Sequence, residues 1–257
     1  MLIAVVLRQV PDTEAQIIID PKDSTRILEN DLKWILNPYD EYAVEAAVSI
    51  AEDEDAETLA VCIGPERSET ALRTALAMGI DAAVHIQSQT GLESDIITEA
   101  QVIAEVLRSR SPSLVLCGRE YIDTSDDALA AALAEYLNMP HVLNVTKLDF
   151  TSETLSTERE IDGNILQIDV PLPGVVSCQK GLNEPRYPNL MAVRRAQKKP
   201  IETLSVQDLG LNIDSPLIEC KTLLEPPQRT AGKIVSGEPS DTARQAAEWL
   251  KNDAKAF

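Results

Sequence analysis

Histidine and cysteine are scarce in this sequence, with two histidines and four cysteines among 257 residues. No CxxC pair occurs, so the ligand spacing typical of a zinc or haem site is missing and we expect no metal centre. The cysteines lie far apart, and most fall in apolar, strand-like runs where a thiol is usually a small core residue. This pattern favours a cytoplasmic protein with reduced cysteines. The cysteines are Cys62, Cys117, Cys178 and Cys220.

Basic residues and long apolar runs are also few. The chain has 23 lysines and arginines against 42 acidic residues, a net charge of −19, which repels phosphate backbones and argues against nucleic-acid binding. No apolar run approaches the ~20 residues of a membrane span. The first residues, Met1 to Arg8, lack the features of a signal peptide and predict a buried strand. We therefore expect a protein that is not embedded in a membrane.

Catalytic and phosphate-binding motifs are missing as well. No serine sits in a GxSxG elbow, neither histidine has a nucleophile beside it, and no carboxylate pair is typical of acid–base chemistry. His85 lies in an apolar run and is expected in the core, while Glu52 to Asp55 form an acidic run expected in solvent. GxGxxG and GxxxxGK[ST] are both absent. The pattern predicts a binding module with no catalytic residue.

The first 137 residues alternate regularly between apolar runs and helical stripes. Continuous apolar runs predict buried parallel strands, and the segments between them carry apolar residues at helical spacing. Asn37-Pro38 predicts a helix start, with asparagine as N-cap. We expect an α/β fold, a Rossmann-like and mostly parallel sheet with flanking helices. The expected strands are 2–7, 58–63, 82–86 and 113–118, and the expected helices run from 38 to about 50, 66–78, 95–108 and 126–137.

The pattern changes after residue 141. Four further strand-like runs follow with little helix between them, and Asp162-Gly163 predicts a hairpin turn. We expect one α/β domain over residues 1–200. Residues 201–257 carry only isolated apolar positions and a terminal helix near Ser240 to Leu250. This C-terminal arm is too short of apolar sequence to form its own core, so it needs this domain or another chain to lie on.

A proline-containing loop joins the domain to the arm. Pro185 and Pro188 make it stiff and extended, because each proline fixes its own φ and restricts the residue before it. Glu184 and Arg186 can pair across Pro185. Leu190 and the adjacent Met191 then present an apolar tip beside a basic run. The residues alone favour a domain-to-arm linker, and a docking device is the alternative.

The loops that follow the expected strands suggest a ligand site. In open parallel sheets ligands bind at the carboxyl ends of the strands, where these loops converge. Asp126 and Asp127 place negative charge where a phosphate would approach a helix start, so this signal is weak. The residues expected around one adenine nucleotide are Val6, Asn37, Pro38, Tyr39, Asp40, Ile63, Gly118, Asp123, Ser125, Asp126, Asp127, Ala128 and Leu129.

The loop sequence Leu182-Asn183-Glu184-Pro185-Arg186-Tyr187, with Leu190 and then Ala196-Gln197-Lys198-Lys199-Pro200-Ile201, resembles the signature of the electron-transfer flavoprotein β subunit. Other segments agree, so the resemblance covers essentially the whole chain. They are Val10-Pro11-Asp12, Asn37-Pro38-Tyr39-Asp40-Glu41, Gly64-Pro65 with Thr74 to Gly79, and Glu158 to Gly163.

The resemblance implies an electron carrier subunit rather than an enzyme. In the family the β subunit pairs with an α subunit that holds most of the FAD, and the C-terminal arm wraps that partner. The heterodimer takes electrons from flavoprotein dehydrogenases, such as acyl-CoA or amine dehydrogenases, to a membrane quinone oxidoreductase. The resemblance makes residues 182–199 a recognition loop with Leu190 as anchor, and links Glu160 to motion of the flavin domain. The implied docking residues are Asn183, Glu184, Pro185, Arg186, Tyr187, Leu190, Met191 and Glu160.

The resemblance also implies AMP, or a second FAD, at the adenine-nucleotide site, but the phosphate loop departs from the family pattern. The usual polar partners are replaced by Asp127, Ala128 and Leu129. We therefore expect AMP to be bound weakly, differently or not at all, and a second FAD is less expected still. Two alternatives are a stand-alone adenine-nucleotide-binding regulator of the universal-stress type, and a dehydrogenase with its own nicotinamide site. Neither gives the arm or the recognition loop a role.

Overall fold

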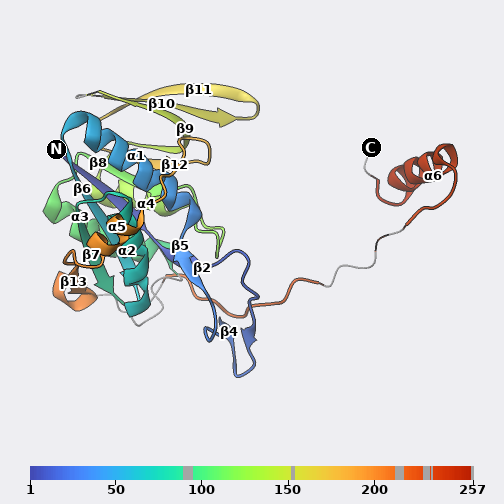
Figure 1. The fold of residues 1–257 in the computed structure, drawn as a ribbon, viewed down its shortest axis with the longest axis horizontal. Helices are drawn as coiled ribbons and strands as arrows, with labels where there is room; N and C mark the ends of the chain where they lie inside the picture. The colour runs from blue at the N-terminus through green and yellow to red at the C-terminus, as the bar shows by residue number, and fades with distance from the viewer. Residues whose placement is uncertain (89–94, 152–153, 212–216, 228–231, 233, 256–257) are drawn as a thin grey trace. The chain divides into compact units, whose positions relative to one another are not determined.

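The computed structural model describes residues 1–88, 95–151, 154–211, 217–227, 232 and 234–255. Its centre is a nine-stranded sheet in the order β11-β10-β9-β12-β8-β1-β6-β7-β13. All neighbours are parallel except β9 with β10 and β10 with β11. The expected α/β fold is thus confirmed (Figure 1). The strands are β1 (Leu2–Leu7), β6 (Glu57–Gly64), β7 (Ala82–Gln87), β8 (Leu114–Gly118), β9 (His141–Phe150), β10 (Thr154–Ile161), β11 (Asn164–Pro171), β12 (Gly174–Cys178) and β13 (Glu202–Ser205).

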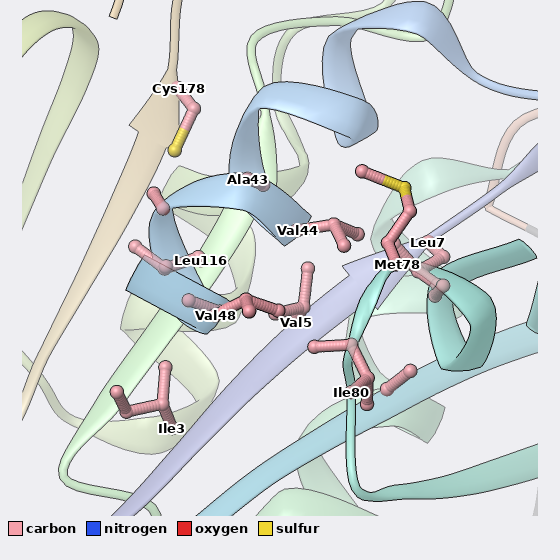
Figure 2. Close-up of a cluster of buried hydrophobic side chains, with 14 of the residues drawn as sticks. Ile3, Val5, Leu7, Ala43, Val44, Val48, Met78, Ile80, Leu116 and Cys178 are labelled. Carbon is pink, nitrogen blue, oxygen red and sulfur yellow. The ribbon is translucent and has the colours of Figure 1, made fainter. Parts of the chain in front are cut away.

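Helices cover both faces of the sheet. Along β1, Ile3, Val5 and Leu7 belong to one buried cluster and Ala4 and Val6 to the other, because successive side chains of a strand point to opposite faces. The first cluster packs under α1 and α2, and Figure 2 shows Val5 of β1 beside Val44 and Val48 of α1. The second packs under α3 and α4. The helices of these layers are α1 (Pro38–Glu54), α2 (Glu69–Met78), α3 (Ile96–Arg110), α4 (Leu129–Leu137) and the short α5 (Leu190–Ala196).

The remaining elements are small. A two-stranded sheet pairs β2 (Gln9–Pro11) with β5 (Trp34–Leu36), and a second pairs β3 (Ile19–Asp20) with β4 (Asp23–Ile27). Short 3-10 helices lie at η1 (Glu66–Ser68) and η3 (Val206–Leu209). The predicted hairpin turn is confirmed, because Asp162 and Gly163 both have positive φ, 50° and 77°, as a two-residue type I′ turn requires. No helix among the described residues is long and apolar enough to cross a membrane.

Two helix predictions differ from the structure in detail. The helix expected from residue 126 begins at Leu129, so Asp126 and Asp127 lie in the loop before α4. The reason is local pairing: the Tyr121 amide donates to the Asp126 carbonyl at 3.0 Å, which holds that residue in an isolated bridge. Asn37 does precede α1, but its side chain makes no capping bond to that helix.

The chain divides into two compact units, Met1–Thr222 and Leu223–Phe257. The sequence places the arm from residue 201, yet β13 adds a ninth strand to the sheet by pairing in parallel with β7. The second unit contains α6 (Pro239–Asn252), close to the expected terminal helix. No residue of α6 is buried, and Trp249 is 39 % exposed. Among the described residues of this unit, none belongs to a buried hydrophobic cluster.

Candidate functional site

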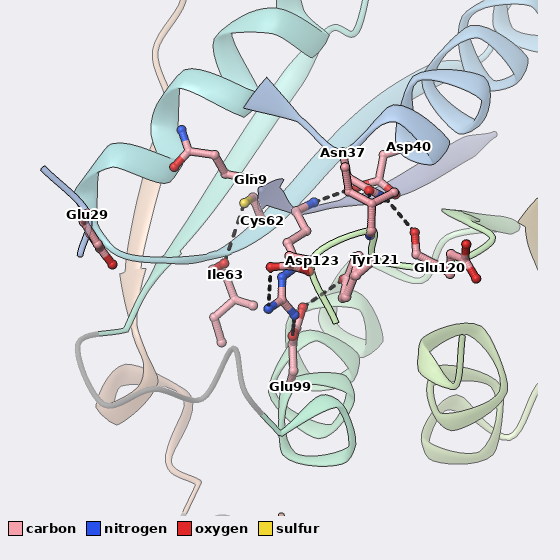
Figure 3. Close-up of polar contacts among 12 residues, drawn as sticks. Gln9, Glu29, Asn37, Asp40, Cys62, Ile63, Glu99, Glu120, Tyr121 and Asp123 are labelled. Carbon is pink, nitrogen blue, oxygen red and sulfur yellow. Dashed lines mark hydrogen bonds and ion pairs between the residues drawn. The ribbon is translucent and has the colours of Figure 1, made fainter. Parts of the chain in front are cut away.

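The carboxyl ends of β1 and β8 meet at a buried carboxylate. Asp40, in the first turn of α1, is fully buried. One of its oxygens accepts from the Arg8 amide at 2.8 Å, and the other accepts from the Asn37 side-chain amide at 2.9 Å and from the Gly118 amide at 3.2 Å. Asn37 also donates to the Glu120 carbonyl at 2.9 Å. The start of α1 is therefore tied to two parallel strands (Figure 3).

An internal ion-pair cluster around Arg8 lies next to Asp40. The guanidinium lies 3.4 Å from a Glu99 oxygen and 3.2 Å from an Asp123 oxygen, and it covers the Tyr121 ring at 4.5 Å from the centroid. The Tyr121 hydroxyl donates to Glu99 at 2.9 Å. Figure 3 shows the side chains of Glu99, Tyr121 and Asp123 lying close together. The Arg8 charge is thus matched within the chain by two carboxylates.

The structure gathers only part of the predicted nucleotide set at this place. Asn37, Asp40, Gly118 and Asp123 come together around the cluster, whereas Val6 and Leu129 are core residues. Ile63 is a core residue as well, and Ala128 packs against that core. Pro38 and Tyr39 begin α1, and Ser125, Asp126 and Asp127 lie in the loop between β8 and α4. Sequence reasoning missed Arg8, Glu99 and Tyr121. The sequence feature that could have found them is Arg8, a basic residue directly after a buried strand. A charged side chain at such a place needs a partner of opposite charge when it is buried.

Burial raises the pKa of Asp40 from 3.8 to about 7. The hydrogen bonds from Asn37, Arg8 and Gly118 lower it, and the charge of Glu99 raises it further. Because the folded-state pKa exceeds the unfolded one, this group stabilises the fold below about pH 4, and that contribution is lost as the pH rises through about 7. The stabilisation that Asp40 provides therefore decreases as the pH rises toward neutral.

Asp40→Asn should remove this pH dependence and lower the free energy of unfolding by about 2 kcal/mol at pH 5, because an amide nitrogen would face donors that now reach an acceptor. Urea unfolding at pH 5, 6, 7 and 8 measures both effects. We expect the stability of the wild-type protein to approach that of the variant as the pH rises. Two parallel curves would contradict the assignment of the slope to Asp40.

The recognition loop is attached to α1 by Arg186. The sequence allows Arg186 to pair with Glu184, but its guanidinium instead binds Glu45 at 2.8 and 2.9 Å and Glu52 at 2.7 and 3.1 Å. These glutamates are seven residues apart on one helix face, which the loop crosses. The Asn183 side chain also donates to the Tyr42 carbonyl at 2.9 Å. Glu52 is thus exposed, as expected for the acidic run, but it is also paired.

A second attachment holds the far end of the loop. Asn189 caps α5 by accepting from the Ala192 amide at 2.9 Å, and Ala196 is buried against the first core cluster. Arg73 of α2 donates to the Ala196 carbonyl at 2.8 Å, and Lys199 donates to the Ile80 carbonyl at 2.8 Å. The docking tip, which we define as Tyr187, Leu190 and Met191, stays 98, 66 and 62 % exposed.

Glu160 lies on β10, away from the docking tip in the sequence. It lines an open cavity of about 790 Å³ with Arg119, Lys180 and residues of β9.

The buried histidine expected in the core is confirmed, because His85 is 1 % exposed with a ring nitrogen 3.2 Å from the Gly64 carbonyl. Burial lowers the pKa of His85. The hydrogen bond with the Gly64 carbonyl raises this pKa, but by less than burial lowers it.

Comparison with known proteins identifies the family of this chain. Residues 24–209 match the family model of the electron transfer flavoprotein domain. The chain is 37 % identical over 260 residues to the electron transfer flavoprotein subunit beta of Bacillus subtilis, covering 100 % of both chains. It is 34 % identical to the protein of that name from Homo sapiens over 233 residues, covering 90 % of this chain and 91 % of the other. The chain therefore belongs to the β-subunit family of electron transfer flavoproteins.

Proposed function

We propose that this chain is the β subunit of a heterodimeric electron-transfer flavoprotein with FAD held mainly by its α subunit. In this role it is an electron carrier, taking electrons from a flavoprotein dehydrogenase such as an acyl-CoA or amine dehydrogenase and passing them to a quinone oxidoreductase. The observation that carries the proposal is the docking tip, whose apolar side chains are exposed while both ends of the loop are fixed. An exposed apolar group on a rigid mount is typical of a protein–protein contact.

The second compact unit supports the pairing with an α subunit. Residues 223–257 form a unit whose helix, Pro239–Asn252, has no buried residue. We infer that this arm lies on the α subunit. All four cysteines are free, which fits a reducing compartment, and we place the protein in the cytoplasm.

Co-expression with a candidate α subunit tests the assembly. We expect a yellow complex with equal amounts of both chains and bound FAD. A truncation after Thr222 should abolish that complex if the arm carries the pairing, whereas the full chain serves as control. A colourless, monomeric protein in the presence of the α subunit would contradict the proposal and favour a stand-alone nucleotide-binding regulator.

We further propose that AMP is bound weakly or not at all. The Arg8 guanidinium is already paired with Glu99 and Asp123, and a carboxylate oxygen of Asp126 accepts from the Ala128 amide at 3.0 Å, just before α4. An amide at the start of a helix is the group that a phosphate would need. The chain supplies its own anion there instead.

Acid extraction of the purified heterodimer should release FAD but AMP far below one per complex. The FAD in the same chromatogram is the internal control, because it shows that extraction was complete. AMP in an amount equal to FAD would contradict this proposal and leave the electron-carrier role untouched.

A further inference from the structure

The hydrogen bonds of Arg186 go to α1 within the chain. Four of its hydrogen bonds go to the carboxylates of Glu45 and Glu52, and its own backbone amide donates to Glu45 at 2.9 Å. The Glu45 side chain is only 9 % exposed. Arg186 therefore has little donor capacity left for another protein, although the family resemblance counts it among the docking residues.

The two carboxylates hold the guanidinium in a fixed orientation. Paired, parallel bonds between guanidinium and carboxylate restrict direction as well as distance, unlike a single contact to a lysine. Burial alone would raise the pKa of Glu45, but the hydrogen bonds and charge of Arg186 bring it below its usual range. Glu45 thus stays ionised at neutral pH and the contact persists there.

Helix α1 passes this constraint on to the sheet. Its first turn is tied to the ends of β1 and β8 through Asp40, and the following turns hold the loop through Tyr42, Glu45 and Glu52. The segment between Leu182 and Asn189 has no helix or strand of its own. Without the contacts to α1, no helix or strand would fix the chain around Tyr187 and up to Leu190.

We propose that Glu45 and Glu52 are positioning residues for docking: through Arg186 they hold the docking tip in the arrangement that a flavoprotein dehydrogenase binds. This rests on the proposed function of the loop. A loop that is already ordered does not lose conformational freedom on binding, so the affinity for the partner is higher than for a loose loop. Neither glutamate touches the partner in this scheme.

The test uses the intact heterodimer with Glu45→Gln, Arg186→Gln and Arg186→Lys. Glu54→Gln is the matched control, because it makes the same change at an exposed residue of the same helix. Hydrogen exchange of the peptide covering 182–197 reports on loop order. Steady-state reduction by the dehydrogenase gives KM for the heterodimer and kcat separately, and flavin content is measured alongside.

We expect Glu45→Gln and Arg186→Gln to speed exchange of the loop and to raise KM roughly tenfold, with kcat and flavin content unchanged. Arg186→Lys keeps the positive charge but not the paired hydrogen bonds, so its KM should lie between those of the wild type and Arg186→Gln. Glu54→Gln should match the wild type. If Glu45→Gln prevents assembly, Glu52→Gln at the more exposed carboxylate gives the same comparison with a smaller shift.

Faster exchange or a lower melting temperature with an unchanged KM would overturn the positioning role, since the contact would then serve stability alone. Failure of the docking proposal itself gives a different result. In that case Leu190→Ala also leaves KM unchanged, whereas a raised KM for Leu190→Ala and a normal KM for Glu45→Gln would overturn only the positioning role.

Discussion

Replacing Gly118 by alanine should lower the free energy of unfolding by about 3 kcal/mol. A Cβ at this position would overlap a carboxylate oxygen of Asp40 and would lie 2.7 Å from the Tyr39 carbonyl carbon and 2.8 Å from the Asp40 amide nitrogen. Two of these atoms belong to the backbone of α1, so a side-chain rotation does not relieve the overlap. The Gly118 amide must also keep its bond to Asp40, which prevents β8 from moving away.

Urea unfolding followed by circular dichroism measures this loss. Gly232→Ala is the matched control, because a Cβ there meets no atom of the described residues within 4 Å and the residue has no restricted φ. We expect that change to stay within about 0.5 kcal/mol of the wild type. Equal stabilities for the two variants would show that the contact between α1 and β8 is looser than the structure indicates.

Leu190→Ala should reduce kcat/KM for reduction of the heterodimer by roughly 30-fold, which corresponds to about 2 kcal/mol of lost contact with the dehydrogenase. Leu190 is 66 % exposed, so its side chain contributes little to folding and the variant should assemble and bind flavin normally. Its position at the first residue of α5, between the attachments at Arg186 and Lys199, keeps the side chain outside the core.

The same kinetic assay with Ile18→Ala provides the comparison. Ile18 is 47 % exposed and lies outside the recognition loop, so its loss tests whether any exposed aliphatic side chain has the same effect. We expect unchanged kinetics for Ile18→Ala. Equal losses in both variants would mean that docking depends on general surface hydrophobicity and not on the tip.

Local patterns in the sequence predicted the sheet well. Continuous apolar runs located β1, β6, β7 and β8, because strands buried on both faces need apolar side chains at every position. Asp162-Gly163 located the hairpin because only such residues accept positive φ at two successive positions. These features depend on neighbours in the sequence, which a single chain displays directly.

The site was less predictable because its contacts join distant residues. The sequence allowed Arg186 to pair with its near neighbour Glu184, whereas its partners Glu45 and Glu52 are more than 130 residues away. Glu99 lies on an otherwise apolar helix face. Its role could not be predicted because its partner Arg8 follows β1, 91 residues earlier in the chain. The start of α4 was misplaced because the bridge between Tyr121 and Asp126 competes with the helix for the same residues.

Anaerobic mixing of the assembled heterodimer with a substrate-reduced flavoprotein dehydrogenase tests the central claim most directly. If this chain is the β subunit of an electron carrier, the flavin absorbance of the heterodimer should fall as electrons arrive, at a rate that increases with dehydrogenase concentration. The isolated chain should show no such signal, because we place the flavin mainly in its partner. A heterodimer whose flavin stays oxidised beside reduced acyl-CoA and amine dehydrogenases would contradict the account.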